Sequence, residues 1–483
     1  MYILTIDVGS SSTRALVIQH DGTQSLPIMD TLASISYQFE HDAEGRASIN
    51  ADTLREGVEG CVDACLQHPL ASQIEAVGIC TFVGNLLIVD ADNRPLNELD
   101  TYADRRSARY CEAIAQQMDT HALHQRTGAL LNSAYYLPKL HLHRALIEAH
   151  PQCSVLDFAT YCYRDWFGEA VPMSYSVASW SGMLDRTRLT WDDLSVQAVP
   201  WVRGHLPELT DYTSVQRGLS AGYRQRWQAL VDVPFYLAVG DGASAQVGSG
   251  ALNAERATLT IGTTSAIRHV ITDDTPTVPD GCWSYRIDRE HHLIGGALSE
   301  GGNIFGWAQD TLQINVAELE QTLHQRSPGA HGLDVLPLLN GERSPGWRSD
   351  ATGTLHGLRL NTRALDIAHA LLEGVALRLA WIVTQLNLTP QTTLMGAGGA
   401  LHQSPAWAQM IAHATGHTVA VIDTPQVSAL GVAQMIACDQ RNIPLKASDV
   451  PISVHYHASA THTAQFADLQ ERQRRLYDLM ENL

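Results

Sequence analysis

Positive charge is in short supply in this sequence, and the shortage excludes two classes of protein. The 483 residues carry 32 Lys and Arg against 51 Asp and Glu, which gives a formal net charge of −19 at pH 7. A protein that wraps nucleic acid or lies on an anionic membrane needs a basic surface. We therefore expect neither nucleic acid nor a membrane among its partners, and any bound phosphate must be held by local groups.

Long apolar runs and targeting signals are lacking as well. No apolar run reaches the length of about 18 residues that a membrane-spanning helix requires. The N-terminus enters a strand-like stretch at once, without the basic segment and apolar core of a secretory signal. The sequence therefore predicts a cytoplasmic location.

Clustered cysteines and the common metal and nucleotide motifs are also missing. The eight Cys are scattered along the chain, which predicts reduced thiols rather than a disulfide framework or a cysteine metal site. The histidines show no HExxH spacing, which argues against a histidine metal site. Because the sequence has no Gly-x-x-x-x-Gly-Lys-Ser/Thr motif, a nucleotide would not be bound by a P-loop.

What the sequence does contain is an internal repeat of one short motif, the echo. "LTIDVGSSSTRALVI" (residues 4–18) and "LTIGTTSAIRHVI" (residues 259–271) share a strand, a Gly/Ser/Thr turn and a returning strand with one Arg. Each copy opens about half of a chain whose length suits two domains, or three. We therefore predict a duplicated α/β domain, divided into residues 1–238 and 239–483.

The apolar periodicity supports this mixed architecture. It predicts strands at residues 2–8, 14–20, 33–38 and 74–81, and helices near residues 51–67, 105–118, 134–150 and 366–387. A further helix is expected to have Ser404 as its N-cap and Pro405 in its first turn, and to end at Gly416.

The two Gly/Ser/Thr turns favour an oxyanion site. Such a turn places backbone N–H groups and hydroxyls around a concavity that suits phosphates. Asp7 at the end of the first strand can hold the waters of Mg²⁺, and Arg14 can bind a phosphate through two nitrogens. A single turn of this kind is usually an ordinary hairpin, but its second copy at residues 262–265 favours two opposed hairpins that grip one triphosphate.

Asp241 in "VGDGAS" (residues 239–244) ends an apolar strand between two glycines. A carboxylate in this position can take the proton of a substrate hydroxyl during phosphoryl transfer, a contribution of about 10²–10⁴-fold. An Asp that caps the following helix is the alternative, and both roles can hold together.

In "LDTYADRRS" (residues 99–107), a ring, a carboxylate and two guanidinium groups suit a polyhydroxylated ligand, although a solvated charged loop explains them equally well.

Together these motifs resemble those of the FGGY carbohydrate kinases. The resemblance spans the chain and rests on "DVGSSSTR" (residues 7–14), "VGDGASAQVGSGAL" (residues 239–252), "GALSEGGNIFGWAQD" (residues 296–310), "LPLLNGERSPGWRSDATGTLHGL" (residues 336–358) and "GAGGALHQSPAWAQM" (residues 396–410). It implies an α/β fold of two actin-like, ribonuclease-H-like ATPase domains around a central cleft, with the sugar on the N-terminal side and the nucleotide on the C-terminal side. It implies ATP and Mg²⁺ as cofactors and allows a homodimer.

The resemblance also implies roles for individual residues. Asp241 matches the catalytic base, which lies beside the substrate and the metal, and Asp7 matches the carboxylate that positions Mg²⁺. The nucleotide-binding residues would be Ser11, Ser12, Thr13 and Arg14 along the phosphates, Gly262, Thr263 and Thr264 opposite them, and Gly302, Gly398, Gly399, Ala400 and Ser404 around the ribose and base.

The sugar end departs from the family pattern. Phe82, Val83 and Gly84 stand where many relatives have Gln-Met-His, and Tyr102 stands where they have Trp. Asp104 matches the substrate-binding Asp and is expected to carry much of the remaining sugar recognition.

The sequence therefore predicts an ATP-dependent kinase that phosphorylates a terminal hydroxyl of a small sugar or sugar acid, in the manner of a gluconate kinase. A kinase of xylulose or of another pentulose or polyol is the alternative. A non-catalytic, nucleotide-gated sugar sensor is a remote alternative, and the presence of both Asp7 and Asp241 argues against it.

Overall fold

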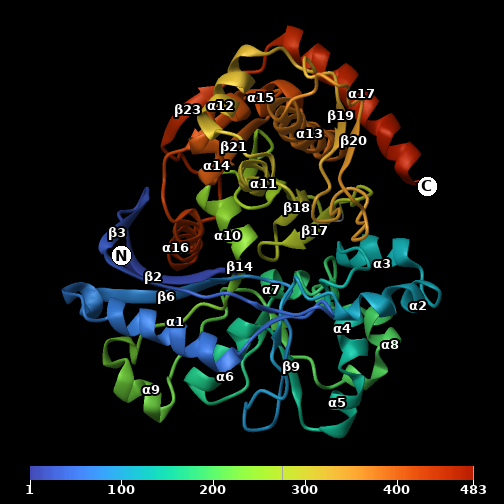
Figure 1. Ribbon diagram of the computed structural model, residues 1–483. Helices are drawn as coiled ribbons and strands as arrows, with labels where there is room; N and C mark the ends of the chain where they lie inside the picture. Colours follow the sequence, from blue (N-terminus) through green and yellow to red (C-terminus); the bar gives the residue numbers. More distant parts are fainter. Residues whose placement is uncertain (275, 482–483) are drawn as a thin grey trace.

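The two echoing segments each open a mixed β-sheet in the computed structural model, which describes residues 1–274 and 276–481. Each sheet forms the centre of one lobe (Figure 1). The first sheet has the strand order β14 (Val239–Gly240), β6 (Ile74–Thr81), β1 (Tyr2–Val8), β2 (Ser12–His20), β3 (Ser25–Ser36). The second has the order β17 (Trp283–Arg286), β18 (His292–Leu298), β16 (Ser265–Ile271), β15 (Arg256–Ile261), β21 (Thr393–Ala397), β22 (Val419–Ile422), β23 (Ile452–Tyr456).

The two sheets share one connectivity. β1 pairs antiparallel with β2 and parallel with β6, just as β15 pairs antiparallel with β16 and parallel with β21. The next strand on each side also matches. β3 is antiparallel to β2 as β18 is to β16, and β14 is parallel to β6 as β22 is to β21. This repeat confirms the predicted α/β fold of two like domains.

The first lobe is completed by short helices and ladders. Its helices are α1 (Ala51–Cys65), α2 (Cys111–Ala115), α3 (Thr120–Thr127), α4 (Tyr136–Leu142), α5 (Arg144–Ala149), α6 (Phe158–Phe167), α7 (Tyr175–Ser179), α8 (Asp193–Ala198) and α9 (Ala221–Arg226), with 3₁₀ turns at Pro69–Gln73, Arg106–Tyr110, Pro200–Val202 and Gln228–Leu230. Its small ladders are formed by β4 (Glu40–His41), β5 (Ala47–Ile49), β7 (Leu87–Val89), β8 (Leu99–Asp100), β9 (Ser154–Leu156), β10 (Met173–Ser174), β11 (Leu184–Asp185), β12 (Thr190–Trp191) and β13 (Leu209–Thr210).

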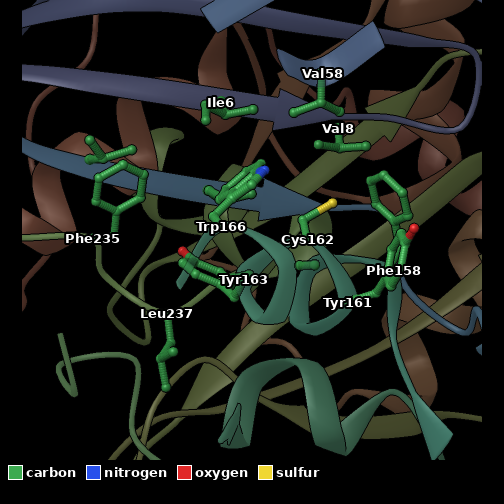
Figure 2. Close-up of a cluster of buried hydrophobic side chains, with 14 of the residues drawn as sticks. Ile6, Val8, Val58, Phe158, Tyr161, Cys162, Tyr163, Trp166, Phe235 and Leu237 are labelled. Atoms are coloured by element: carbon green, nitrogen blue, oxygen red, sulfur yellow. The ribbon is translucent and has the colours of Figure 1, made fainter. Parts of the chain in front are cut away.

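The main core of this lobe lies between the first sheet and the helices α1 and α6. Ile6 and Val8 of β1 pack there with Val58 of α1 and Trp166 of α6 (Figure 2). Because successive side chains of a strand alternate between its faces, Asp7 points to the opposite face, toward the second lobe. The core therefore sets the direction of the carboxylate that the sequence assigned to magnesium.

The second lobe holds eight helices among the described residues, including the two longest, α13 and α17. These are α10 (Asp241–Gly248), α11 (Asn303–Leu312), α12 (Val316–Gln325), α13 (Ala364–Gln385), α14 (Gly399–Gln403), α15 (Pro405–Thr415), α16 (Val427–Gln440) and α17 (Ala460–Glu481), with a ladder of β19 (Asp334–Leu336) and β20 (Thr354–His356). The caps predicted for α15 are confirmed, because Ser404 Oγ accepts a hydrogen bond from Trp407 N (3.2 Å) and Gly416 is left-handed. Helix α13 is apolar and long enough to cross a membrane, but 83% of its most apolar window is buried in the lobe, as expected for a core helix.

Helices α10 and α16 form a layer between the two sheets (Figure 1). One apolar cluster joins Ile3 of β1 and Ala76 of β6 to Val247 of α10 and Ile436 of α16. The first sheet also takes in β14, so it extends two residues past the division expected at residue 238. A segment from near the C-terminus thus covers one face of the N-terminal sheet.

The α10–α16 crossing is a contact between backbones. A Cβ on Gly431 of α16 would lie 1.9 Å from the Ser244 carbonyl oxygen, and a Cβ on Gly248 of α10 would lie 1.9 Å from the Val427 carbonyl oxygen. Only glycine fits at these two positions without a shift of a helix.

His292, the first residue of β18, gives stability a measurable pH dependence. It is 0% exposed, and burial together with the guanidinium groups of Arg286 and Arg186 lowers its pKa to about 3. Below about pH 6.5 the unfolded chain binds a proton here that the folded chain does not. The folded state therefore becomes less stable as the pH is lowered. Between pH 7 and pH 5 the wild type should therefore lose about 2 kcal/mol more than His292→Gln.

Urea denaturation at the two pH values measures this difference. The exposed His402→Gln is the matched control and should follow the wild type. If the stability of His292→Gln falls as steeply with pH as that of the wild type, the buried imidazole is not the source of the slope.

Candidate active site

Two carboxylates lie at the ends of two parallel strands, β1 and β14, that flank β6. In the first sheet Asp7 of β1 stands beside Cys80 of β6, and Cys80 stands beside Val239 of β14, after which Asp241 begins α10. Parallel strands end at the same edge of a sheet, so Asp7 and Asp241 come together there. The Cys80 thiol between them donates a hydrogen bond to Asp7 Oδ1 (3.2 Å).

The two carboxyl groups interact electrostatically. Burial raises the pKa of Asp241 to about 6; Arg268 and the Gly242 N–H oppose this rise, and Asp7 adds to it. Burial likewise raises the pKa of Asp7, against the Cys80 hydrogen bond and the charge of Arg14. Two carboxylates that repel each other when both are ionised suit a hard divalent cation such as Mg²⁺, because the cation offsets their charge and prefers oxygen ligands.

The turn around Asp241 is closely packed by two side chains from other segments. Asp241 Oδ1 accepts a hydrogen bond from Gly242 N (2.7 Å), which fixes one oxygen of the carboxylate. A Cβ on Gly240 would lie 2.8 Å from Trp180 Nε1, and a Cβ on Gly242 would lie 3.3 Å from Arg268 Nε. Both nitrogens are buried and have no hydrogen-bond partner among the described residues. The glycines therefore bring two unused donors next to the carboxylate.

On the second lobe, three glycine-containing turns meet. Gly302 N donates to the Gly262 carbonyl oxygen (2.7 Å). A Cβ on Gly398, which has a φ of +111°, would lie 2.2 Å from the Ile261 carbonyl oxygen, and a Cβ on Gly302 would lie 3.3 Å from Ala400 Cβ. Gly262 itself faces open space. This backbone-lined rim, which also includes Gly399 and the exposed Thr263 and Thr264, fits the phosphates and sugar of a nucleotide.

The first hairpin has two different sides. Arg14 lies directly across the ladder from Asp7, and its NH1 donates to Gln426 Oε1 (3.1 Å) in the second lobe. Ser11 is exposed and Ser12 partly so. Thr13 is 0% exposed, and its hydroxyl lies 3.1 Å from the Tyr37 hydroxyl. Contrary to the sequence-based expectation, the Thr13 hydroxyl thus stabilises the hairpin and does not face the phosphates.

Ser404 also differs from expectation. It is buried, it caps α15 through Trp407 N, and its hydroxyl donates to the Glu320 carboxylate of α12. Since these contacts use the hydroxyl, Ser404 is a helix cap and not a ligand of the ribose or base.

At the predicted sugar end, Phe82 is a core residue. Its side chain is 1% exposed, and its ring lies 5.8 Å from that of Phe39 and 6.4 Å from that of Phe158, measured between centroids. It belongs to the apolar core of the first lobe. The expectation that Phe82 lines the sugar pocket is therefore not met, because the strand that ends at Thr81 directs the next ring inward.

Gly84 and Tyr102 lie together. A Cβ on Gly84, whose φ is +71°, would lie 3.1 Å from Tyr102 Cβ. The carbonyl groups of Gly84 and Thr101 accept hydrogen bonds from Lys139 Nζ (2.6 and 2.7 Å), and burial lowers the pKa of Lys139 to about 8. The Tyr102 side chain remains 43% exposed and free to meet a ligand.

Asp104 is buried and already has partners. Its carboxylate accepts hydrogen bonds from Ala47 N (3.1 Å) and from Arg106 N and Nε (both 3.0 Å), and Arg106 NH2 completes an ion pair at 2.8 Å. These bonds fix the loop in which Tyr102 lies. A direct contact between Asp104 and a sugar stays a prediction.

Sequence reasoning missed several residues near Asp241. Trp180 stacks on Tyr285 with ring centroids 3.7 Å apart, and the Tyr285 hydroxyl lies 2.5 Å from the Tyr135 hydroxyl. Arg343 lies close enough to oppose the rise in the pKa of Tyr135 that burial causes. These residues come from distant segments, so no local pattern joins them. Of these residues only Arg268 could be noticed in the sequence, because it is the Arg in the second copy of the repeated motif at residues 259–271.

Comparisons with known proteins identify two family domains. The N-terminal domain of the FGGY family of carbohydrate kinases matches residues 2–248, and the C-terminal domain matches residues 257–438. A gluconokinase from Bacillus licheniformis is 26% identical over 96% of this chain and 93% of its own length. A xylulose kinase from Escherichia coli (strain K12) is 26% identical over 85% of this chain and 86% of its own length. The ligand-bound xylulose kinase from Lactobacillus acidophilus has the same fold, with a TM-score of 0.89 and 21% identity over 99% of this chain and 98% of that one.

Proposed function

This chain belongs to the FGGY family of carbohydrate kinases, and we propose that it transfers the γ-phosphate of ATP to a terminal hydroxyl of a small sugar acid like gluconate. The observation that carries the proposal is the pair Asp7 and Asp241, placed at one edge of the first sheet on either side of β6 and beside two unused donors. We also propose a cytoplasmic location.

In this reaction Asp241 accepts the proton of the attacking hydroxyl. The Gly242 N–H holds Oδ1, which leaves Oδ2 to face the substrate. A carboxyl whose pKa burial raises to about 6 is a stronger base than an ordinary Asp and is still ionised at neutral pH. Asp7 and Asp241 would hold Mg²⁺, which would offset phosphate charge when bound. The rim around Gly262, Gly302 and Gly398 would hold the nucleotide.

A sugar acid is favoured over a neutral sugar by two guanidinium groups. Arg268 lies beside Gly242 and lowers the pKa of Asp241 relative to what burial alone would give. Arg343 is near enough to act on the pKa of Arg268 and of Tyr135. A protein with a net charge of −19 repels anions unless local cations attract them. The two groups supply that attraction for a carboxylate.

The test is kcat/KM on gluconate, xylulose, ribulose and glycerol in a coupled assay. We expect gluconate to exceed the other substrates by at least about tenfold, and we expect Arg343→Met to remove most of that advantage by raising the KM for gluconate. The exposed Arg359→Met is the matched control and should behave as wild type.

A second candidate, xylulose phosphorylation, is supported by the similarity to the Escherichia coli xylulose kinase. If xylulose gives the highest kcat/KM and Arg343→Met leaves the order of substrates unchanged, the sugar-acid proposal is wrong and the pentulose assignment replaces it.

A further inference from the structure

Helix α13 carries a His and a Glu one turn apart that belong to neither the nucleotide nor the sugar site. His369 and Glu373 point into the second lobe, where His331 meets them from the segment between α12 and β19. The three side chains are 0%, 3% and 1% exposed, respectively. Three groups that commonly bind metals are thus gathered in one buried place.

The distances suit coordination of one ion. His331 Nε2 lies 2.9 Å from Glu373 Oε1, and His369 Nε2 lies 3.8 Å from Glu373 Oε2. One ligand atom from each of the three residues falls within 4.8 Å of the others. Tetrahedral ligands about 2.0–2.1 Å from a Zn²⁺ are separated by roughly 3.3 Å, so only small side-chain movements are needed.

His369 adds an independent observation. Neither of its ring nitrogens has a hydrogen-bond partner among the described residues, although the side chain is entirely buried. Buried polar atoms without a partner are rare and call for a ligand, a water or an ion. Burial lowers the pKa of His369 to about 4, so the ring is neutral and keeps a lone pair. The nearby Arg326 does not oppose a cation strongly, because Asp366 pairs with it at 2.5 Å.

A cavity borders one side of this cluster. It has a volume of about 100 Å³, and His369 forms part of its wall. Further polar wall residues are His324, Arg326, Gln409, His413 and His462. The cavity leaves room beside His369 for one water, which can serve as the fourth ligand of the ion.

We propose that His331, His369 and Glu373 bind one first-row divalent transition-metal ion, with Zn²⁺ as the best fit, as a structural site. Two imidazoles and one carboxylate suit Zn²⁺, whereas Mg²⁺ prefers oxygen ligands alone. Coordination through His331 Nε2 moves the ring proton to Nδ1. The Leu333 N–H, which donates to Nδ1 at 3.1 Å, then loses this acceptor, a cost that the metal bonds must exceed. The ion would tie the segment before β19 to the core helix α13.

The test uses the full chain, freed of metal with a chelator and then titrated with ZnCl₂. Elemental analysis after gel filtration should give one Zn²⁺ per chain, and saturation should raise Tm by about 5 °C. Co²⁺ should give the strong visible absorption of a tetrahedral site. A wild type that retains far less than one Zn²⁺ per chain overturns the proposal.

Two variants locate the site. Glu373→Gln keeps an acceptor for Gly329 N, which donates to Glu373 Oε2 at 2.9 Å, and His369→Leu fills the space of the ring. Each should weaken Zn²⁺ binding at least about 100-fold while kinase activity without Zn²⁺ stays normal, which shows that the variants fold. His462→Gln is the matched control, since His462 and His413 have rings 4.5 Å apart in the same cavity. Loss of binding only in His462→Gln, or normal binding in both cluster variants, overturns the proposal.

Discussion

Asp241→Asn should lower kcat at least about a hundredfold while the fold and ATP binding remain intact. The amide cannot take up the hydroxyl proton, yet its oxygen can still accept the hydrogen bond from Gly242 N (2.7 Å). The exchange is nearly isosteric, so α10 should begin at the same residue. Steady-state kinetics with saturating sugar, together with calorimetric titration of ATP, separate the loss of chemistry from a loss of binding.

The matched control for this variant is Asp119→Asn. Asp119 caps α3 by accepting a hydrogen bond from Ala122 N (2.9 Å), and Asn is an equally good N-cap. Its kcat should equal that of the wild type. If Asp241→Asn also turns over at a near-normal rate, Asp241 is only the first residue of a helix and the base must be sought elsewhere.

Gly431→Ala should destabilise the protein by about 1–3 kcal/mol and lower activity at least about tenfold. The added Cβ would lie 1.9 Å from the Ser244 carbonyl oxygen, so α16 and α10 must move apart. Because Asp241 is the first residue of α10, this movement also shifts the carboxylate relative to Asp7. Chemical denaturation and kcat/KM on the best sugar measure the two effects.

Gly60→Ala is the matched control for the crossing. Gly60 also lies within a helix, α1, but a Cβ there meets nothing within 4 Å. Alanine forms helices better than glycine, so this variant should be more stable by about 0.5–1 kcal/mol. Equal stability of Gly431→Ala and wild type would show that the helices can separate without cost.

The repeated fold could be predicted because its signals are local. The echo between residues 4–18 and 259–271 fixes two like sheets, and Ser404 with Gly416 marks both ends of α15. The helix expected at residues 134–150 instead divides at His143, whose Nε2 lies 2.5 Å from Asp100 Oδ2. That contact joins segments 43 residues apart, which periodicity cannot detect.

The candidate site was only partly predictable for the same reason. Asp7 and Asp241 each end an apolar strand, so the sequence marks them. The direction of a side chain just beyond a strand is set by packing, and for that reason the inward position of Phe82 was missed. The cluster of His331, His369 and Glu373 escaped notice because only His369 and Glu373 are close in sequence. A search for histidine motifs such as HExxH could not detect a cluster of this kind.

The position of α16 also constrains how the chain folds during synthesis. The first sheet is nearly complete once residue 81 has left the ribosome, but the face of β1 and β6 that α16 covers stays uncovered until residues 427–440 emerge. For most of translation this apolar face is open to chaperones and to other nascent chains. The first lobe thus depends on a segment from near the C-terminus to cover this face of its sheet.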